Sequence, residues 1–243
     1  MVDRSGENEL SARSSTAEPL PQADDKAAAV EEMFDRIAPR YDRLNRIMTF
    51  RMDVGWRHRA VSDLALPRGS LVLDVACGTG DLCRDLDEAG LFAIGVDFSA
   101  GMLAASRTDA PLVRADALRL PAHDGSIDGV TCGFALRNFV GVAPFFAESA
   151  RVLRPGGRFA VLEVAEPDSR LLRAGHHLYF RRIVPFIGGL LSDHAAYSYL
   201  PASTAYLPPP AELLRLARDS GFADVRRTLL GLGAAQLLTG TRQ

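Results

Sequence analysis

Hydrophobic residues follow two different spacings along this chain. Near its start, Val30, Met33, Phe34 and Ile37 recur every three or four residues, which predicts an amphipathic helix. Beyond residue 70 the apolar residues gather in short runs separated by segments of helical length, and each run predicts a buried strand. Seven strands are expected, over residues 71–75, 92–96, 112–115, 127–132, 159–163, 225–229 and 234–241. We also expect a helix over residues 99–106 and a turn over residues 154–157.

Strands that alternate with helices favour right-handed βαβ crossovers. The expected fold is α/β, a mostly parallel Rossmann-like sheet of seven strands with helices on both faces. Residues 27–68 keep the helical spacing, interrupted at Pro39, and predict an N-terminal helical cap. Residues 166–210 are too long for a simple crossover and unusually apolar, so we interpret them as a substrate-side insertion. The chain then forms one domain, residues 26–243, behind a tail, residues 1–25, whose polar composition predicts disorder.

Composition narrows the class of protein. With 47% hydrophobic and 24% charged residues among 243, the chain has the balance of an ordinary globular domain. Its formal net charge of −2 argues against a nucleic-acid partner. Cys77, Cys83 and Cys132 show neither a disulfide framework nor a metal-binding spacing with histidine, so we expect a reducing cytoplasm and no metal site. We see no signal segment, and no apolar run reaches the ~18 residues that a membrane span requires.

The strongest local signal directly follows the first strand, where the chain reads Asp-Val-Ala-Cys-Gly-Thr-Gly-Asp. Gly78 and Gly80 allow a sharp turn and the close approach of a ligand, and the next helix presents N–H groups to that ligand. A dinucleotide fingerprint would place a third glycine where Cys83 stands, and a P-loop lysine is also missing. A glycine turn without a ligand is the alternative. We assign the binding of a different cofactor to Asp74, Gly78, Thr79 and Gly80.

Acidic residues also follow the next two strands. Asp97 ends the second strand, where a carboxylate can accept hydrogen bonds from both hydroxyls of a ribose; a helix cap is the alternative, although Ser99 suits that role. Asp116 and Ala117 follow the third strand, where an acid and a backbone N–H can bind adenine. Because ligands of open α/β sheets bind at the carboxyl ends of the strands, we predict S-adenosylmethionine there, its sulfonium near the glycines and Gly133.

Seven segments outside the tail match one known family, at residues 33–45, 56–57, 77–82, 133–138, 185–188, 197–203 and 221–222. They are similar to class I methyltransferases, and more narrowly to the family that C-methylates demethylmenaquinone and the benzoquinol precursor of ubiquinone. The resemblance implies the Rossmann-like methyltransferase fold, S-adenosylmethionine as cofactor and a lipophilic quinol as substrate. The chain departs from the family pattern at Ala135, residues 139–141 and residues 163–165, all on the expected substrate side.

Methylation of a ring carbon requires that the ring be made nucleophilic. A cation or a base beside a phenol oxygen does this by increasing electron density on the adjacent carbon. We predict Arg137 as the first catalytic residue and Tyr41, a donor or base, as the second. The alternatives are a carboxylate-paired arginine and a packing tyrosine. Asn138 either positions substrate or caps a helix, and His194 beside Asp193 is a weaker candidate base.

These observations favour S-adenosylmethionine-dependent C-methylation of a prenylated quinol, by resemblance demethylmenaquinol to menaquinol in menaquinone biosynthesis. Two alternatives stay open: a methyltransferase for another small aromatic or polyketide metabolite, and a non-catalytic binding module. In the insertion, apolar residues alternate with Arg170, Arg173, Arg181 and Arg182, which suits either a buried helix or peripheral contact with the inner face of the membrane. The sequence predicts no particular oligomeric state.

Overall fold

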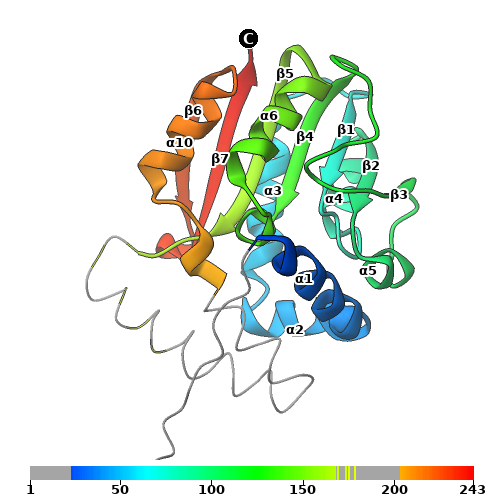
Figure 1. The fold of residues 1–243 in the computed structure, drawn as a ribbon, viewed down its shortest axis with the longest axis vertical. Coiled ribbons are helices and arrows are strands. Elements are labelled where there is room, and N and C mark those ends of the chain that lie inside the picture. The colour runs from blue at the N-terminus through cyan, green and yellow to red at the C-terminus, as the bar shows by residue number, and fades with distance from the viewer. Residues whose placement is uncertain (1–22, 168, 170–172, 174, 176–177, 179–202) are drawn as a thin grey trace, which may run out of the picture.

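The computed structural model describes residues 23–167, 169, 173, 175, 178 and 203–243, and within them seven strands form one sheet (Figure 1). In chain order the strands are β1 (Leu71–Val75), β2 (Phe92–Asp97), β3 (Leu112–Arg114), β4 (Ile127–Gly133), β5 (Leu153–Val164), β6 (Phe222–Leu230) and β7 (Ala235–Arg242). Their order across the sheet is β3-β2-β1-β4-β5-β7-β6, and only the pairs made by β7 are antiparallel among the described residues. The predicted, mostly parallel sheet is confirmed.

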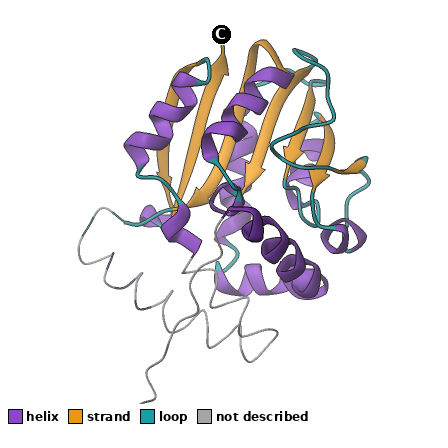
Figure 2. Ribbon diagram, in the orientation of Figure 1, coloured by secondary structure: helices purple, strands orange, loops and turns teal. Residues whose placement is uncertain are grey.

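Helices cover both faces of this sheet (Figure 2). One face carries α6 (Val142–Val152) and α10 (Pro210–Asp219), which contact each other, and the other carries α3 (Met52–Leu64) and α4 (Asp81–Glu88). Fully buried phenylalanines, including Phe145 and Phe159, fill the first interface, whereas mainly leucines and alanines fill the second. Apolar side chains on both sides of the central strands explain why these strands are continuous hydrophobic runs in the sequence.

The predicted N-terminal cap consists of α1 (Ala23–Ile37), a short 3₁₀ helix η1 (Ala38–Arg40), α2 (Tyr41–Met48) and α3. The predicted break at Pro39 lies in η1. Helix α1 begins at Ala23, three residues before the predicted start of the domain at position 26. In Figure 1, α1 and α2 lie at the end of the sheet where the parallel strands finish.

Two elements differ from their predicted extents. The helix expected over residues 99–106 is shorter, with Ser99 as N-cap of α5 (Ala100–Ala104); its hydroxyl accepts a hydrogen bond from Met102 N. The turn expected at residues 154–157 lies inside β5, because Leu153 already pairs with Ile127 before the ladder resumes at Arg158. Most of the insertion lies outside the described residues. Where the chain is described, none of its helices is both long and apolar enough to cross a bilayer.

Candidate functional site

Two adjoining pockets lie at the carboxyl edge of the sheet. The first extends along β2, β3 and α1, and the second lies between α2, α3 and the end of β4. Both are lined by Tyr41, Ala76, Gly78, Gly133 and Phe134, so the two pockets meet at these residues. Ala76 and Phe134 have left-handed backbones, with φ of 55° and 59°. Such conformations are costly for residues with a side chain, and they cluster at binding sites.

The glycine loop after β1 requires its glycines for different reasons. Gly80 has φ of 85°, and a Cβ there would lie 2.4 Å from Cγ2 of Thr108. Gly78 also has a left-handed backbone, with φ of 58°, but its missing side chain leaves open space in front of Tyr41. Gly80 is therefore needed for packing, whereas Gly78 keeps the junction of the two pockets clear.

Asp97 fixes this loop from the neighbouring strand. Its Oδ2 accepts a hydrogen bond from Gly78 N at 2.7 Å, and its Oδ1 accepts one from Ser99 N at 2.8 Å. Loss of solvation raises the pKa of Asp97, and the hydrogen bonds from backbone N–H groups oppose this shift. Each carboxylate oxygen can accept a second hydrogen bond, so Asp97 can hold both the loop and two ligand hydroxyls.

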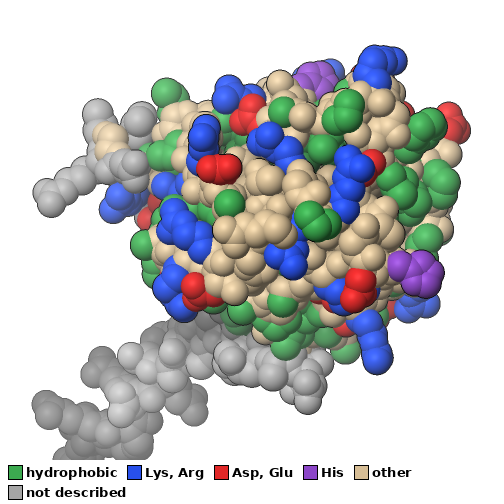
Figure 3. All heavy atoms as spheres, turned by 90° about the horizontal axis from the view of Figure 1, so that it is seen from above, with side chains coloured by type: hydrophobic (Ala, Val, Ile, Leu, Met, Phe, Trp, Pro, Cys, Tyr) green, Lys and Arg blue, Asp and Glu red, His purple; other side chains and the backbone are tan. Residues whose placement is uncertain are grey.

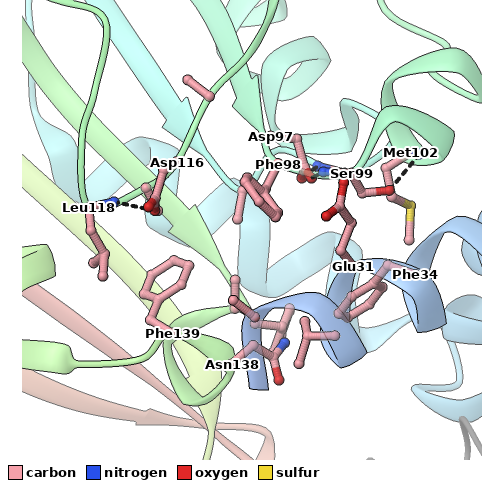
Figure 4. A pocket seen from close by; sticks show the side chains of 18 of the residues that line it. Glu31, Phe34, Asp97, Phe98, Ser99, Met102, Asp116, Leu118, Asn138 and Phe139 are labelled. Carbon is pink, nitrogen blue, oxygen red and sulfur yellow. Dashed lines mark hydrogen bonds between the residues drawn. The ribbon is translucent and has the colours of Figure 1, made fainter. Parts of the chain in front are cut away.

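Aromatic and aliphatic side chains surround the rest of the first pocket (Figure 4). Asp116 is exposed at its rim, where Oδ1 accepts a hydrogen bond from Leu118 N at 2.8 Å, and Ala117 is buried beside it. Phe98 and Phe139 also line this part of the pocket. A flat ring with polar edges fits between such apolar surfaces, with Asp116 available at its edge.

Helix α1 closes the first pocket, which the sequence did not indicate. Three polar contacts hold this helix in place. Glu31 forms an ion pair with Arg114 at 2.7 Å, and Asp35 accepts a hydrogen bond from Ser99 Oγ at 2.5 Å. The third contact joins Lys26 to the short helix η2 (Leu136–Asn138). Between these contacts, apolar residues of α1 such as Phe34 line the pocket (Figure 4).

The contact made by Lys26 is buried. Its Nζ donates to the carbonyl oxygens of Arg137 at 2.9 Å and Phe139 at 2.8 Å, and it lies 3.8 Å from the ring centroid of Tyr206. Burial lowers the pKa of Lys26. The single lysine of the sequence thus joins α1 to the turn that carries Arg137.

Asp74 lines the second pocket from the end of β1 and is 1% exposed. Its carboxylate accepts hydrogen bonds from Thr131 Oγ1 at 2.8 Å and from Cys83 Sγ at 3.5 Å. Loss of solvation raises its pKa to about 7, against the opposing effect of those two donors. A cation in this pocket would favour the ionised form of Asp74.

Thr79 points away from the first pocket, because its buried hydroxyl donates to Asp42 on α2. Next to it, the buried side chain of Arg57 binds Asp53 at 2.6 Å and Asp85 at 2.7 Å. These contacts fix α2 and α3 against the start of α4. Sequence reasoning did not single out Arg57 or Asp53, although their four-residue spacing on one helix is typical of an ion pair.

Arg137 is buried at the edge of the second pocket, where its guanidinium forms an ion pair with the fully buried Glu163. Its Nη1 also donates to Phe134 O at 2.6 Å, and its Nε donates to Ser203 Oγ at 3.1 Å. Nη2 makes no hydrogen bond to any residue that the structure describes. The arrangement agrees with a carboxylate-paired arginine and also leaves one N–H₂ group for a ligand.

Tyr41 lies at the junction of the pockets and packs edge-on against Phe34, with ring centroids 5.9 Å apart. Loss of solvation raises its pKa, so its phenol is protonated at neutral pH. Tyr41 is therefore suited to donate a hydrogen bond rather than to act as a base in the resting protein.

The walls of the second pocket are largely apolar. Met48, Met52, Trp56 and Leu82 line it, and the ring centroids of Trp56 and Phe134 lie 6.1 Å apart. A planar, apolar ring is the kind of ligand that such a wall accommodates.

The structure describes only some of the remaining histidine and insertion residues. His58 Nε2 lies 3.5 Å from Asp85 Oδ1, a partner that the sequence did not indicate, but Asp85 is already bound by Arg57. His194 and three of the four insertion arginines lie outside the described residues. The fourth, Arg173, donates to Pro167 O at 2.9 Å.

Comparisons with known proteins agree with this geometry. The model of the ubiE/COQ5 methyltransferase family matches residues 22–242. A demethylmenaquinone methyltransferase of Roseiflexus castenholzii is 46% identical, covering 92% of this chain and 98% of its own length. A ubiquinone/menaquinone biosynthesis C-methyltransferase of Geobacter sulfurreducens is 38% identical, covering 90% of each. A methyltransferase structure from Thermotoga maritima, 21% identical, covers 88% of this chain and 99% of its own with a TM-score of 0.61, which supports the fold.

Proposed function

This chain belongs to the ubiE/COQ5 methyltransferase family, and we propose that it uses S-adenosylmethionine to methylate a ring carbon of a prenylated quinol. The names of its relatives favour demethylmenaquinol as substrate and menaquinone biosynthesis as the pathway. The observation that carries the proposal is the meeting of two unlike pockets at Tyr41, Gly78 and Gly133. The first pocket is lined by Asp97 and Asp116, which follow successive strands. The second pocket is largely apolar and has the buried Arg137 at its edge.

The first pocket has the chemistry to hold the adenosyl group of S-adenosylmethionine. Asp97 would accept hydrogen bonds from the ribose, and Asp116 with Ala117 would bind the adenine edge. Gly78 leaves space at the junction for the sulfonium end, and Asp74 would balance the charge of the amino group. When bound, S-adenosylmethionine supplies an electrophilic methyl group at a sulfonium. Thr79 would act indirectly, by joining the loop to Asp42.

The second pocket has the chemistry to activate a quinol. We assign Nη2 of Arg137 to a ring oxygen, where its positive charge favours the phenolate and thereby increases electron density on the adjacent carbon. Glu163 holds the guanidinium in place through its ion pair. Tyr41, protonated because its pKa is raised, would donate a hydrogen bond at the junction. The apolar wall around Trp56 would exclude water from the reacting atoms.

A prenylated quinol resides in the bilayer, so the proposed substrate implies peripheral contact with the inner face of the membrane.

A test in solution should precede any test with membranes. The protein is incubated with S-adenosylmethionine and a demethylnaphthoquinol bearing a short side chain under reducing conditions, and the products are analysed by mass spectrometry. We expect addition of one methyl group to a ring carbon, and faster reaction than with a matching benzoquinol. Binding of S-adenosylmethionine without any methylated quinol would overturn the substrate assignment.

A further inference from the structure

We propose that the outer face of α2 and the turn after it bind an anionic phospholipid bilayer, from which the quinol enters the second pocket. The inference rests on the proposed function, since it concerns the route of that substrate. We call this surface the α2 face, and its residues are Arg40, Arg43, Ile47, Phe50, Arg51 and Arg107.

The two sides of α2 differ in composition. Leu44 and Met48 face the protein and are 2% and 9% exposed. Arg40, Arg43 and Ile47 follow one another at spacings of three and four residues, and all three are exposed. A stripe that mixes arginine with a large aliphatic residue is typical of a helix at a membrane surface, where the arginines meet headgroups and the aliphatic side chain meets acyl chains.

Large apolar side chains continue this stripe beyond the helix. Phe50 is 70% exposed, Met52 44% and Ile47 38%. Phe50 and Arg51 both have left-handed backbones, with φ of 51° and 61°, although neither is glycine. The fold therefore holds an exposed phenylalanine in a costly backbone conformation. Contiguous exposed apolar residues of this kind mark a surface that binds a partner.

The charge of the surface favours an anionic partner. A hollow beside α2 is lined by Arg40, Arg43, Arg46, Arg51 and Arg107. Asp42, the acidic residue among the described residues that line it, is buried and accepts a hydrogen bond from the hydroxyl of Thr79. Arg46 lies 3.4 Å from Asp81, whereas the other four arginines form no ion pair with any described residue. By contrast, acidic and basic side chains are interspersed on the end of the molecule seen in Figure 3.

The second pocket reaches this same surface. Met48, Phe50 and Met52 line that pocket, and the latter two are also exposed beside the arginines. A hydrophobic molecule that leaves a bilayer at the α2 face would thus meet the apolar wall of the pocket without crossing water. The combination of apolar residues, arginines and a pocket mouth favours a phospholipid surface over a nucleic acid, which needs no exposed apolar cluster.

Vesicle sedimentation tests the binding surface. We expect the full chain to bind vesicles containing phosphatidylglycerol, to bind phosphatidylcholine vesicles far more weakly, and to be released by high salt. Arg40→Glu/Arg43→Glu should weaken binding to phosphatidylglycerol vesicles by roughly tenfold or more, since each arginine contributes to attraction by anionic lipid. The matched control, Arg218→Glu/Arg226→Glu, makes the same change of charge at exposed arginines on α10 and β6, and should bind nearly as the unchanged protein does.

A pair of activity measurements links the surface to the substrate. With a short-chain quinol in solution, Arg40→Glu/Arg43→Glu should react as fast as the unchanged protein, because neither arginine lines the first or second pocket. With a long-chain quinol embedded in phosphatidylglycerol vesicles, the same variant should lose activity by roughly the factor by which it loses binding. The control variant should keep activity on both quinols.

The possible failures are distinct. Equal binding to phosphatidylcholine and phosphatidylglycerol, or unchanged vesicle binding after Arg40→Glu/Arg43→Glu, would overturn the α2 face as a bilayer site. Preference for RNA over phosphatidylglycerol vesicles, in competition, would replace the bilayer with a nucleic acid. If the unchanged protein binds vesicles through this face but methylates neither quinol, the proposed function fails and the surface assignment stands.

Discussion

Arg137 and Glu163 form the pair on which the second pocket depends. Both side chains are buried, at 5% and 0% exposed, so removing one of them leaves the other charged in an apolar environment. Arg137→Ala should reduce the free energy of unfolding by about 3–5 kcal/mol and also reduce turnover, because it removes both the partner of Glu163 and the proposed cation at the quinol oxygen.

A second variant separates these two effects. Arg137→Ala/Glu163→Gln removes the isolated charge, so we expect it to recover most of the lost stability in urea denaturation. Its turnover with a short-chain quinol should stay as low as that of Arg137→Ala. Recovery of turnover together with stability would show that Arg137 serves the fold alone.

Asp74 makes stability depend on pH. Its pKa is raised from its ordinary value of 3.8 to about 7, so the unfolded chain ionises this group at lower pH than the folded protein does. The free energy of unfolding should therefore fall as the pH rises between these two values, by on the order of 4 kcal/mol for this one group. Asp74→Asn should remove that part of the pH dependence, as measured by urea denaturation at a series of pH values. Parallel curves for the two proteins would contradict the assignment.

The sequence indicated some site residues better than others, for a physical reason. Asp97 and Asp116 follow strands, and parallel strands end at one edge, so their proximity followed from the secondary structure alone. The pairing of Arg137 with Glu163 depends on the register of β5 beside β4, which no local pattern specifies. Thr79 was assigned to the cofactor from its place in the loop, but the direction of its hydroxyl depends on α2.

At the scale of elements, α1 is the part of the site with the weakest local signal. Periodicity predicted a helix but not its position over the first pocket, since that position depends on Lys26, Glu31 and Asp35 meeting residues far along the chain. Residues 154–157 lie within β5 for a similar reason: Leu153 pairs with Ile127 and the ladder resumes at Arg158, while the Arg-Pro-Gly-Gly segment between them makes no pair with β4.

Lys26 offers a direct test of how α1 is held. Lys26→Met keeps the length of the side chain but removes the donor that satisfies two carbonyl oxygens, so we expect faster hydrogen exchange in α1 and weaker binding of S-adenosylmethionine. Glu32→Ala is the matched control, because Glu32 lies on the same helix and its side chain is 75% exposed. Equal exchange in α1 of both variants would mean that Lys26 does not secure the helix.

In the molecule as a whole, the sheet and the helical cap supply different parts of the two pockets. The ends of β1, β2 and β4 supply the glycine loop, the acids and Gly133, and these come from the same sheet that holds the hydrophobic core. The helices α1, α2 and α3 supply the cover of the first pocket and the apolar wall of the second. Ligand binding in the first pocket therefore joins the cap to the sheet, and it should stabilise the whole fold.

This coupling predicts a thermal shift. At a concentration of S-adenosylmethionine about 100 times its dissociation constant, binding adds roughly 2.7 kcal/mol to the free energy of unfolding, which for a chain of this size raises Tm by roughly 5–10 °C. Asp97→Ala removes the acceptor of Gly78 N and the proposed acceptor of the ribose, so at the same concentration its Tm should rise by far less. Asp116→Ala, at the exposed rim, should keep more of the shift than Asp97→Ala does. The same increase in Tm for the unchanged protein and for Asp97→Ala would place the cofactor somewhere other than at the end of β2.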